Sequence, residues 1–273
     1  MKHPLRRGLT LLAAVAVTTV VGCATAQAAP AAPLSDVTVV LVHGAWADSS
    51  SWDGEVTALE QKGYRVRAIA DPLENLTTDA ATVAAFLHTI AGPVVLVGHS
   101  YGGSVITEAA ASSPNVRALV YVDAAAPEVG ETNGSLSGAD SILKHLPEDQ
   151  LFDKVGYPGA PEGATDLYLK KDVFLEHFGN DLPTDEATRL WATQRAASTA
   201  AFDTPATAAG WKTIPSWYFI SSGDQIITPT SEEAMAQRAH SHVTLFQGGS
   251  HLTLISHPDA VTAVIESAAE TVR

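Results

Sequence analysis

The chain has 273 residues, of which 46% are hydrophobic and 17% charged, a composition that supports a sizeable buried core and excludes a disordered chain. Its 16 lysines and arginines stand against 30 aspartates and glutamates, which gives a formal net charge of −14. An acidic surface repels phosphate backbones, so the sequence predicts no nucleic-acid partner. The single cysteine excludes a disulfide scaffold and a cysteine-based zinc site.

Residues 1–28 have the pattern of an export signal. Positively charged residues precede an uncharged, mostly apolar stretch over 9–21, and an A-x-A cleavage site ends at Ala28. As a helix the apolar stretch would reach about 20 Å, which is short of the roughly 30 Å of a bilayer core. The sequence therefore predicts a secreted protein without a membrane span, in which residues 29–36 form a flexible N-terminal lead.

Two variants of export stay open. Val20-Val21-Gly22-Cys23 resembles the lipobox of bacterial lipoproteins, in which the cysteine carries the lipid. Arg6-Arg7 loosely resembles a twin-arginine signal. A lipid anchor at Cys23 is thus the alternative to plain secretion, and under either variant a catalytic cysteine is excluded.

From residue 37 onward, short apolar runs rich in β-branched residues alternate with helical patterns. The runs are nearly continuous, as in strands of a parallel sheet that is buried on both faces. They predict strands at 37–42, 65–70, 94–98, 116–122, 216–221 and 242–247. The helical patterns predict helices at 52–62, 78–90, 101–112, 231–239 and 258–271. The fold class is therefore α/β, a mostly parallel six-stranded sheet flanked by helices in one domain over 37–273.

Residues from about 125 to 210 interrupt this alternation. They contain no clear strand pattern but hold helix-like stretches such as 172–178 and 185–201. A structureless loop of this length is uncommon in a compact domain. We therefore expect a helical cap inserted between two strands of the sheet.

The segment Val94–Gly103 is the most informative part of the chain. An apolar run is followed by G-x-S-x-G, Gly98-His99-Ser100-Tyr101-Gly102, and then by a helical pattern. A strand-to-helix turn this tight strains the backbone of the serine, and the glycines leave room for the crossing chain. Ser100 is the predicted nucleophile. No G-x-x-x-x-G-K-[ST] or G-x-G-x-x-G occurs, which disfavours phosphate binding.

The loop His43-Gly44-Ala45-Trp46 follows the first predicted strand directly. In a strand–elbow–helix architecture, the loop after that strand supplies one donor of the oxyanion hole, and the residue after the nucleophile supplies the other. The predicted donors are the backbone N–H groups of Ala45 and Tyr101. His43 is interpreted as a structural residue that braces the loop.

The remaining members of a catalytic triad are sought at later strand ends. Asp224 and His251 both follow predicted strands at the carboxyl edge of the sheet, where open α/β sheets bind ligands. His251 is the predicted base and Asp224 the acid that fixes its tautomer. Asp123, which also ends a strand, is the alternative acid. No metal site is predicted, because the pair His240 and His242 lacks a third ligand at suitable spacing.

The sequences His43-Gly44-Ala45-Trp46, Gly98–Gly103, Gly223-Asp224 and Ser250-His251 together resemble the α/β-hydrolase fold family. The resemblance is to compact bacterial esterases related to plant methyl-ester esterases and hydroxynitrile lyases. It implies cofactor-free hydrolysis of carboxylic esters. The lyases carry Thr and Lys where this chain has Gly44 and Leu252, which disfavours lyase chemistry.

The sequence therefore predicts a secreted serine hydrolase that cleaves esters of small apolar or aromatic substrates through an acyl-serine, with no cofactor or metal. Trp46, Trp191 and Phe202 are the candidate substrate-binding residues, with ordinary core packing as the alternative. Two other functions stay open. One is a cofactor-free haloperoxidase-like or C–C bond hydrolase with the same triad, and the other is a non-catalytic small-molecule-binding protein on the same fold. The sequence makes no prediction of oligomeric state.

Overall fold

The computed structural model describes Met1 and residues 36–272. The chain divides into one unit over 1–31 and a second over 32–273, and the fold described here is that of the second. The predicted export signal, nearly all of the predicted lead and the cysteine at position 23 lie outside the described residues. Among the residues described, no helix has both the length and the apolar character needed to span a membrane.

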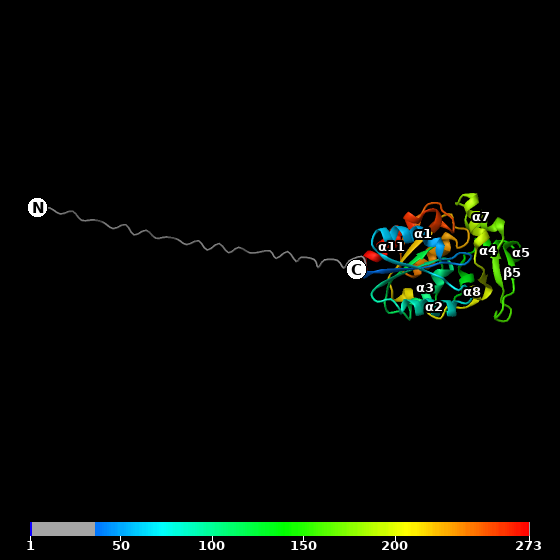
Figure 1. Ribbon diagram of the computed structural model, residues 1–273, viewed down its shortest axis with the longest axis horizontal. Coiled ribbons are helices and arrows are strands. Elements are labelled where there is room, and N and C mark those ends of the chain that lie inside the picture. Colours follow the sequence, from blue (N-terminus) through cyan, green and yellow to red (C-terminus); the bar gives the residue numbers. More distant parts are fainter. Residues whose placement is uncertain (2–35, 273) are drawn as a thin grey trace. The chain divides into compact units, whose positions relative to one another are not determined.

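A six-stranded sheet in the order β2-β1-β3-β4-β8-β9 forms the centre of this unit (Figure 1). Every neighbouring pair of its strands is parallel, which confirms the fold class expected from the sequence. The strands are β1 (Thr38–Val42), β2 (Arg65–Ile69), β3 (Val94–His99), β4 (Val116–Val122), β8 (Ser216–Ser221) and β9 (His242–Phe246). The chain runs outward from β1 to β2 and then returns to β3 on the other side of β1. The carboxyl ends of β1 and β3 thus lie at a topological switch point, where such sheets open a crevice.

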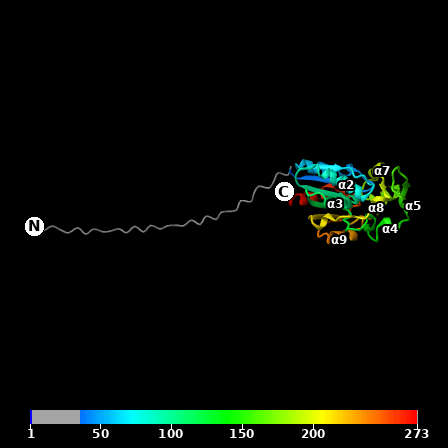
Figure 2. The same ribbon diagram turned by 90° about the horizontal axis from the view of Figure 1, so that it is seen from below.

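Helices cover both faces of the sheet. Figure 1 shows α1 and α11 on one face and α2 and α3 on the other, and Figure 2 shows α9. These helices are α1 (Asp53–Gln61), α2 (Leu76–Leu87), α3 (Tyr101–Ala110), α9 (Pro229–Arg238) and α11 (Pro258–Glu270), with the short α10 (Thr253–Ser256) before α11 and the 3-10 helix η2 (Ser49–Trp52) before α1. Helix α2 begins earlier than the pattern at 78–90 suggests, because the side chain of Asn75 accepts a hydrogen bond from the amide of Thr77 and caps it.

The segment between β4 and β8 forms the cap. Its helices are η3 (Asn133–Leu136), α4 (Ile142–His145), α5 (Glu148–Leu151), α6 (Lys171–Val173), the π-helix η4 (Phe174–Phe178), α7 (Thr184–Thr193), α8 (Thr199–Asp203) and η5 (Gly210–Lys212). It also contains an antiparallel sheet of three strands, β5 (Phe152–Val155), β6 (Asp166–Leu169) and β7 (Ala197–Ser198).

The expectation that this segment holds no strand is corrected by that small sheet. Strand β5 reads Phe-Asp-Lys-Val and is mostly exposed, and β7 has two residues. Runs this short and this polar fall below the length at which period-two alternation can be recognised. Its strands therefore come from tertiary pairing rather than from a local pattern.

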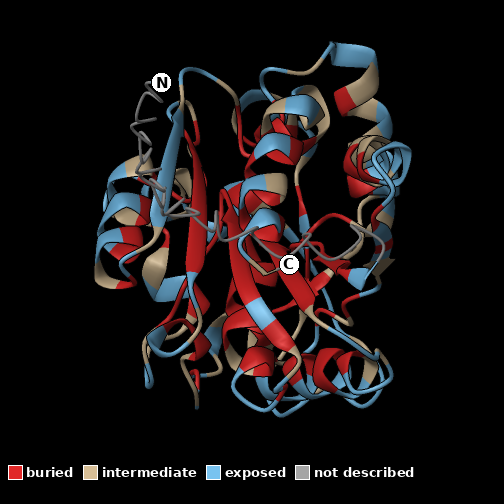
Figure 3. Cartoon of the chain, turned by 90° about the vertical axis from the view of Figure 1, so that its left-hand side faces the viewer, coloured by how far each residue is buried: buried red, intermediate tan, exposed pale blue. Residues whose placement is uncertain are grey.

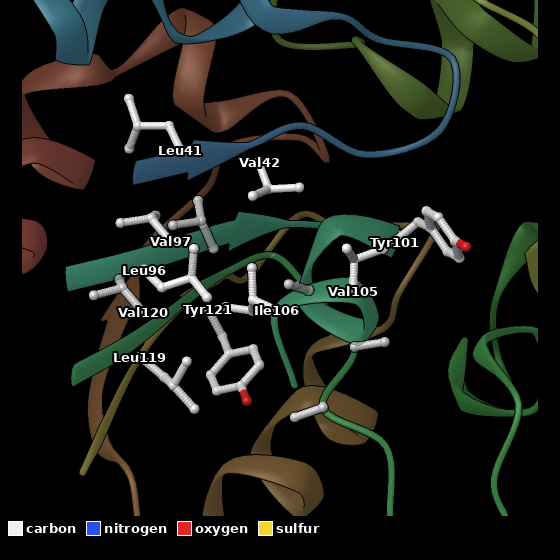
Figure 4. Close-up of a cluster of buried hydrophobic side chains, with 14 of the residues drawn as sticks. Leu41, Val42, Leu96, Val97, Tyr101, Val105, Ile106, Leu119, Val120 and Tyr121 are labelled. Atoms are coloured by element: carbon white, nitrogen blue, oxygen red, sulfur yellow. The ribbon is translucent and has the colours of Figure 1, made fainter. Parts of the chain in front are cut away.

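The core lies between the central strands and the helices. Strands β1 and β3 are buried along their whole length, and Figure 3 shows buried residues along the central strands and exposed residues on the outer surfaces of the helices. Val105 and Ile106 of α3 are fully buried, and Figure 4 shows them beside the side chains of β3 and β4. Burial of an aliphatic side chain contributes about 1.5–3 kcal/mol. This packing holds the start of α3 firmly against the end of β3.

Candidate active site

Ser100 lies between β3 and α3 in a strained backbone conformation. Its φ is 54° and its ψ −122°, a combination that costs a non-glycine residue on the order of 1–3 kcal/mol. The crossing chain leaves room only for glycine at Gly98, where a Cβ would lie 2.5 Å from the carbonyl oxygen of Gly102. The local sequence therefore imposes the sharp turn, which raises the serine hydroxyl above the sheet.

The structure brings Ser100, His251 and Asp224 into one chain of hydrogen bonds. The Nε2 atom of His251 lies 2.7 Å from Ser100 Oγ, and its Nδ1 lies 2.6 Å from Asp224 Oδ2. The residues follow β3, β9 and β8 respectively, so three strands separated by long stretches of sequence contribute one side chain each. Ser100 and Asp224 are each 4% exposed and His251 is fully buried.

The buried environment sets the protonation of this chain. Burial lowers the pKa of His251 well below its ordinary value, so the imidazole is neutral near pH 7. Burial also raises the pKa of the Asp224 carboxyl, and hydrogen bonds from the amides of Ile226 and Ile227 oppose that rise. With Asp224 ionised, Nδ1 of His251 must carry the proton, which leaves the lone pair of Nε2 facing the serine hydroxyl.

The loop over 43–46 is pressed against the turn at Ser100. A Cβ on Gly44 would lie 2.5 Å from the Cβ of Ser100 and 2.9 Å from the carbonyl oxygen of His99, so only glycine fits there. The amide of Tyr101 is the first of α3 and has no acceptor within that helix. Within residues 36–272, the amide of Ala45 donates no hydrogen bond. Both amides are thus free to donate to an oxyanion.

His43 has the contacts of a bracing residue. Its Nε2 accepts a hydrogen bond from the amide of Asp71 at 3.0 Å, which requires that Nδ1 carries the proton. Nδ1 in turn donates to the carbonyl of Gly44 at 2.9 Å. Burial lowers the pKa of His43 to about 4, so the residue is neutral near pH 7. The bond to Asp71 attaches the loop to the segment that follows β2.

Asp123, the alternative acid, has other partners. Its carboxylate accepts hydrogen bonds from the amide of Ser221 at 2.7 Å and from the Ser221 hydroxyl at 2.9 Å. Its oxygens lie within 4.8 Å of those of Asp224 and Glu232, so three buried carboxyl groups form a cluster. Burial and mutual repulsion raise the pKa of Asp123 and of Glu232. The geometry therefore favours Asp224 as the partner of His251.

Aromatic side chains cover this centre on the cap side. Trp46 stacks between Phe152 and Phe202, with ring centroids 5.5 Å away in both cases, and meets Phe178 edge-on at 5.8 Å. Phe178 also packs against His251 at 5.1 Å. We call Trp46, Phe152, Phe178 and Phe202 the aromatic layer.

A cavity of about 170 Å³ lies against the aromatic layer. Its apolar lining is formed by Trp46, Leu143, Phe152, Leu167 and Phe202, and polar side chains such as Lys144 and Asp203 stand among its other lining residues. The two predicted wall residues Trp46 and Phe202 therefore line one cavity, and the lining of this cavity does not include Ser100 or His251.

Trp191, the third candidate substrate-binding residue, lies elsewhere. Its indole N–H donates to the carbonyl of Leu169 at 2.9 Å, and Lys171 Nζ lies 5.5 Å from its ring. It is absent from the lining of the cavity beside the aromatic layer. Helix α7 directs this side chain onto the cap sheet, which a local sequence pattern does not reveal. We leave Trp191 out of the proposed pocket.

Three contacts of the site were not foreseen. His99 Nε2 donates to the backbone carbonyl of His251 at 2.8 Å and so helps to hold the loop that carries it. The hydroxyl of Tyr101 donates to Asp79 at 2.8 Å. The third contact is that of Phe178 with His251. Phe178 lies in the predicted helix-like stretch 172–178, and nothing in the sequence around it predicts this contact. His99 and Tyr101, the two variable residues within G-x-S-x-G, stand where a sequence pattern could have drawn attention to them.

Comparisons with known proteins show to which family and fold this chain is similar. A family model described as "Alpha/beta hydrolase family" matches residues 39–264. Over 122 residues the chain is 36% identical to a carbendazim hydrolyzing esterase from a Nocardioides species. This alignment covers 40% of this chain and 47% of that protein. The chain thus spans about half the length of this relative. It is 26% identical over 259 residues to methylesterase 18 of Arabidopsis thaliana, covering 86% of this chain and 98% of that one.

Among solved structures, polyneuridine aldehyde esterase superposes with a TM-score of 0.71. The superposition covers 85% of this chain and 98% of the esterase at 16% sequence identity. At that identity the likeness shows a shared fold.

Proposed function

The chain belongs to the alpha/beta hydrolase family, and from this premise we propose that it is a serine hydrolase that cleaves carboxylic esters through an acyl-Ser100 intermediate. The observation that carries the proposal is the pair of hydrogen bonds that joins Ser100, His251 and Asp224. Relatives named as hydrolases and esterases support it.

Acylation uses the proton arrangement of the buried triad. As Ser100 Oγ attacks the ester carbonyl carbon, His251 Nε2 takes the hydroxyl proton. The carbonyl oxygen becomes an oxyanion, which accepts hydrogen bonds from the amides of Ala45 and Tyr101. The tetrahedral intermediate collapses, the bond to the alcohol oxygen breaks, and the imidazolium gives its proton to the leaving alcohol. Asp224 stabilises the imidazolium throughout.

Deacylation repeats these steps with water. His251 Nε2 takes a proton from the water as its oxygen attacks the acyl carbon, and the same two amides bind the second oxyanion. The bond from the acyl carbon to Ser100 Oγ then breaks, and the proton returns to Oγ. A carboxylic acid leaves, and the enzyme returns to its starting state.

The cavity beside the aromatic layer supports small apolar or aromatic esters as substrates. Its volume of about 170 Å³ has room for a small ring, and its lining also includes the charged side chains of Lys144, Glu148 and Asp203. Phe152 and Phe202 offer apolar ring surface to a planar group. Contacts of this apolar kind discriminate weakly between similar ligands, so we expect activity on several aryl esters.

Export is part of the proposal and has a test of its own. The pattern over residues 1–28 supports secretion, and Cys23 supports a lipid-anchored form as the alternative. Mass spectrometry of the mature protein, taken from both the culture medium and the membrane fraction of its natural host, distinguishes the two. A mature chain that starts at Ala29 agrees with secretion, whereas one that starts at a lipidated Cys23 agrees with the anchored form.

A fluorophosphonate probe tests the proposed chemistry. We expect one covalent adduct per chain, mapped to Ser100, and no adduct in Ser100→Ala. Labelling at another residue, or none at all, would overturn the mechanism. Labelling at Ser100 without turnover of any ester would instead favour a C–C bond hydrolase, a haloperoxidase-like enzyme or a binding protein.

A further inference from the structure

One side chain links the proposed oxyanion hole to the cap. Trp46 follows Ala45 directly, and its indole N–H donates to the carbonyl of Leu167 in strand β6 at 3.0 Å. Its ring is 3% exposed and contacts Phe152 of β5, Phe178 of η4 and Phe202 of α8. The loop over 43–46 is therefore attached to four elements of the cap through a single residue.

The backbone at Trp46 is held in an unfavourable conformation. Its φ of 58° lies in the left-handed region, which is uncommon for a bulky residue. Such a conformation costs on the order of 1–3 kcal/mol and persists only where the surroundings impose it. The contacts that can impose it here are the hydrogen bond to Leu167 and the stack on Phe152 and Phe202. The peptide that joins residues 45 and 46 thus depends on the cap for its orientation, and it is directly bonded to Ala45, whose own N–H lies in the preceding peptide.

The aromatic layer also reaches the other side of the site. Phe178 packs against the ring of His251 at 5.1 Å, and Phe202 lies 6.0 Å from the ring of Tyr101, whose amide is the second proposed donor. Trp46 is therefore packed against the same rings that border the base and the second donor. A shift of the cap would therefore change the packing around Trp46, the base and the second donor together.

We infer that Trp46 is a positioning residue, whose hydrogen bond to strand β6 holds the turn at 45–46 so that the Ala45 amide is presented to the oxyanion, and that cap docking thereby completes the oxyanion hole. The inference rests on the proposed function, because it concerns a donor of that reaction. It gives Trp46 a role in the rate of the chemical steps as well as in lining the pocket.

The test is Trp46→Phe, which keeps an aromatic ring and removes the indole N–H. Loss of one oxyanion donor lowers the rate about 10²–10³-fold, and misplacement by 1 Å can cost about 10²-fold. We expect kcat on an aryl acetate to fall about 10- to 100-fold with KM changed by less than about threefold. The second-order rate constant for inactivation by a fluorophosphonate falls in parallel, since the phosphoryl oxygen uses the same donors.

Trp211→Phe is the matched control. The indole N–H of Trp211 donates to the carbonyl of Pro127 at 2.9 Å, and its ring packs against Lys212 and Arg238, none of which belongs to the site. This variant loses the same kind of hydrogen bond in a comparably buried indole. We expect its kcat, KM and inactivation rate to stay within about twofold of the wild type.

The outcomes separate this inference from the proposed function. If the wild type is labelled at Ser100 but Trp46→Phe changes KM alone, or behaves as Trp211→Phe does, the positioning role is overturned and the proposed function stands. If Trp46→Phe fails to fold, Phe152→Leu decides, because it removes a stacking partner and keeps the indole hydrogen bond. A roughly 3- to 10-fold lower kcat, whatever the change in KM, supports the inference, and a change in KM alone contradicts it.

Discussion

The carboxyl edge of the central sheet and the cap hold their side chains in different ways. At the sheet edge, Ser100, Asp224 and His251 are almost fully buried and joined by short hydrogen bonds. In the cap, short elements are joined by ion pairs between exposed side chains, such as Lys154 with Glu148, and Phe152 stacks on Trp46 of the loop after β1. The comparison indicates that the chemical steps depend on buried, hydrogen-bonded side chains at the sheet edge. Substrate preference depends on side chains of the cap, which can be substituted one at a time. Trp46 is the point where the two regions meet.

The largest expected effect is at the acid of the triad. Asp224→Asn keeps the shape of the side chain and removes the charge that fixes the tautomer of His251, and the same change in a serine protease lowers kcat about 10⁴-fold. We expect a loss of that order on an aryl ester. Asp123→Asn is the matched control and should lose less than about tenfold, because Asp123 is hydrogen-bonded to Ser221. A larger loss in Asp123→Asn than in Asp224→Asn would reverse the assignment of the acid.

A buried carboxyl group of the sheet region predicts a large effect on stability. Glu55 is fully buried, and burial raises the pKa of its carboxyl to about 9 from an ordinary value of 4.5. Because the folded pKa lies above the unfolded one, its contribution to stability is complete below about pH 4.5 and is lost as the pH rises toward 9. Glu55→Gln removes this loss. We measure the free energy of unfolding of variant and wild type in urea. The difference between them, variant minus wild type, should increase by on the order of 3 kcal/mol from pH 5 to pH 8.

An equal difference between Glu55→Gln and the wild type at both pH values would contradict the neutral state assigned to Glu55. Glu60→Gln, on the exposed face of the same helix, is the control, and its difference from the wild type should be nearly the same at both pH values.

A ring of the cap should affect both KM and kcat. Phe202→Leu removes one ring of the cavity lining and one of the two rings that stack on Trp46, and it leaves the triad and the indole hydrogen bond of Trp46 in place. We expect KM for an aryl ester to rise about 3- to 10-fold and kcat to fall about 3- to 10-fold, and the rise in KM to shrink for an ester without a ring. An equal rise for both esters would show that Phe202 does not contact the aromatic group.

A smaller effect is expected in the pH dependence of kcat/KM. The neutral imidazole is the active form, so activity falls as the pH drops through the pKa of His251. An unperturbed histidine would place that limb near pH 6.5, but burial lowers the pKa of His251. The acid limb should therefore lie below pH 6.5. A limb above that value would show that the charge of Asp224 raises the pKa of His251 by more than burial lowers it.

Parts of the fold with strong local patterns could be predicted from the sequence. The continuous apolar runs of β1 and β3 mark strands buried on both faces, and the glycines around Ser100 mark a turn that no other residue could form. Strands β5 and β7 carry no such pattern, because they are short and owe their form to pairing with β6.

The same distinction applies to the site. Ser100, Asp224 and His251 each follow a recognisable strand, so their order along the chain predicts that they meet. Phe152 and Phe178 reach Trp46 from more than a hundred residues away, and nothing near them in sequence indicates that contact. The catalytic roles stay predictions, which the substitutions above are designed to decide.

The most direct test of the account is to trap the intermediate. The enzyme is mixed with an aryl ester, quenched with acid within the first turnover, and measured by intact-mass spectrometry with peptide mapping. The account predicts a burst of released alcohol and a mass increase of one acyl group on Ser100. An acyl group on another residue, or alcohol release with no trace of an acylated chain during the burst, would contradict it.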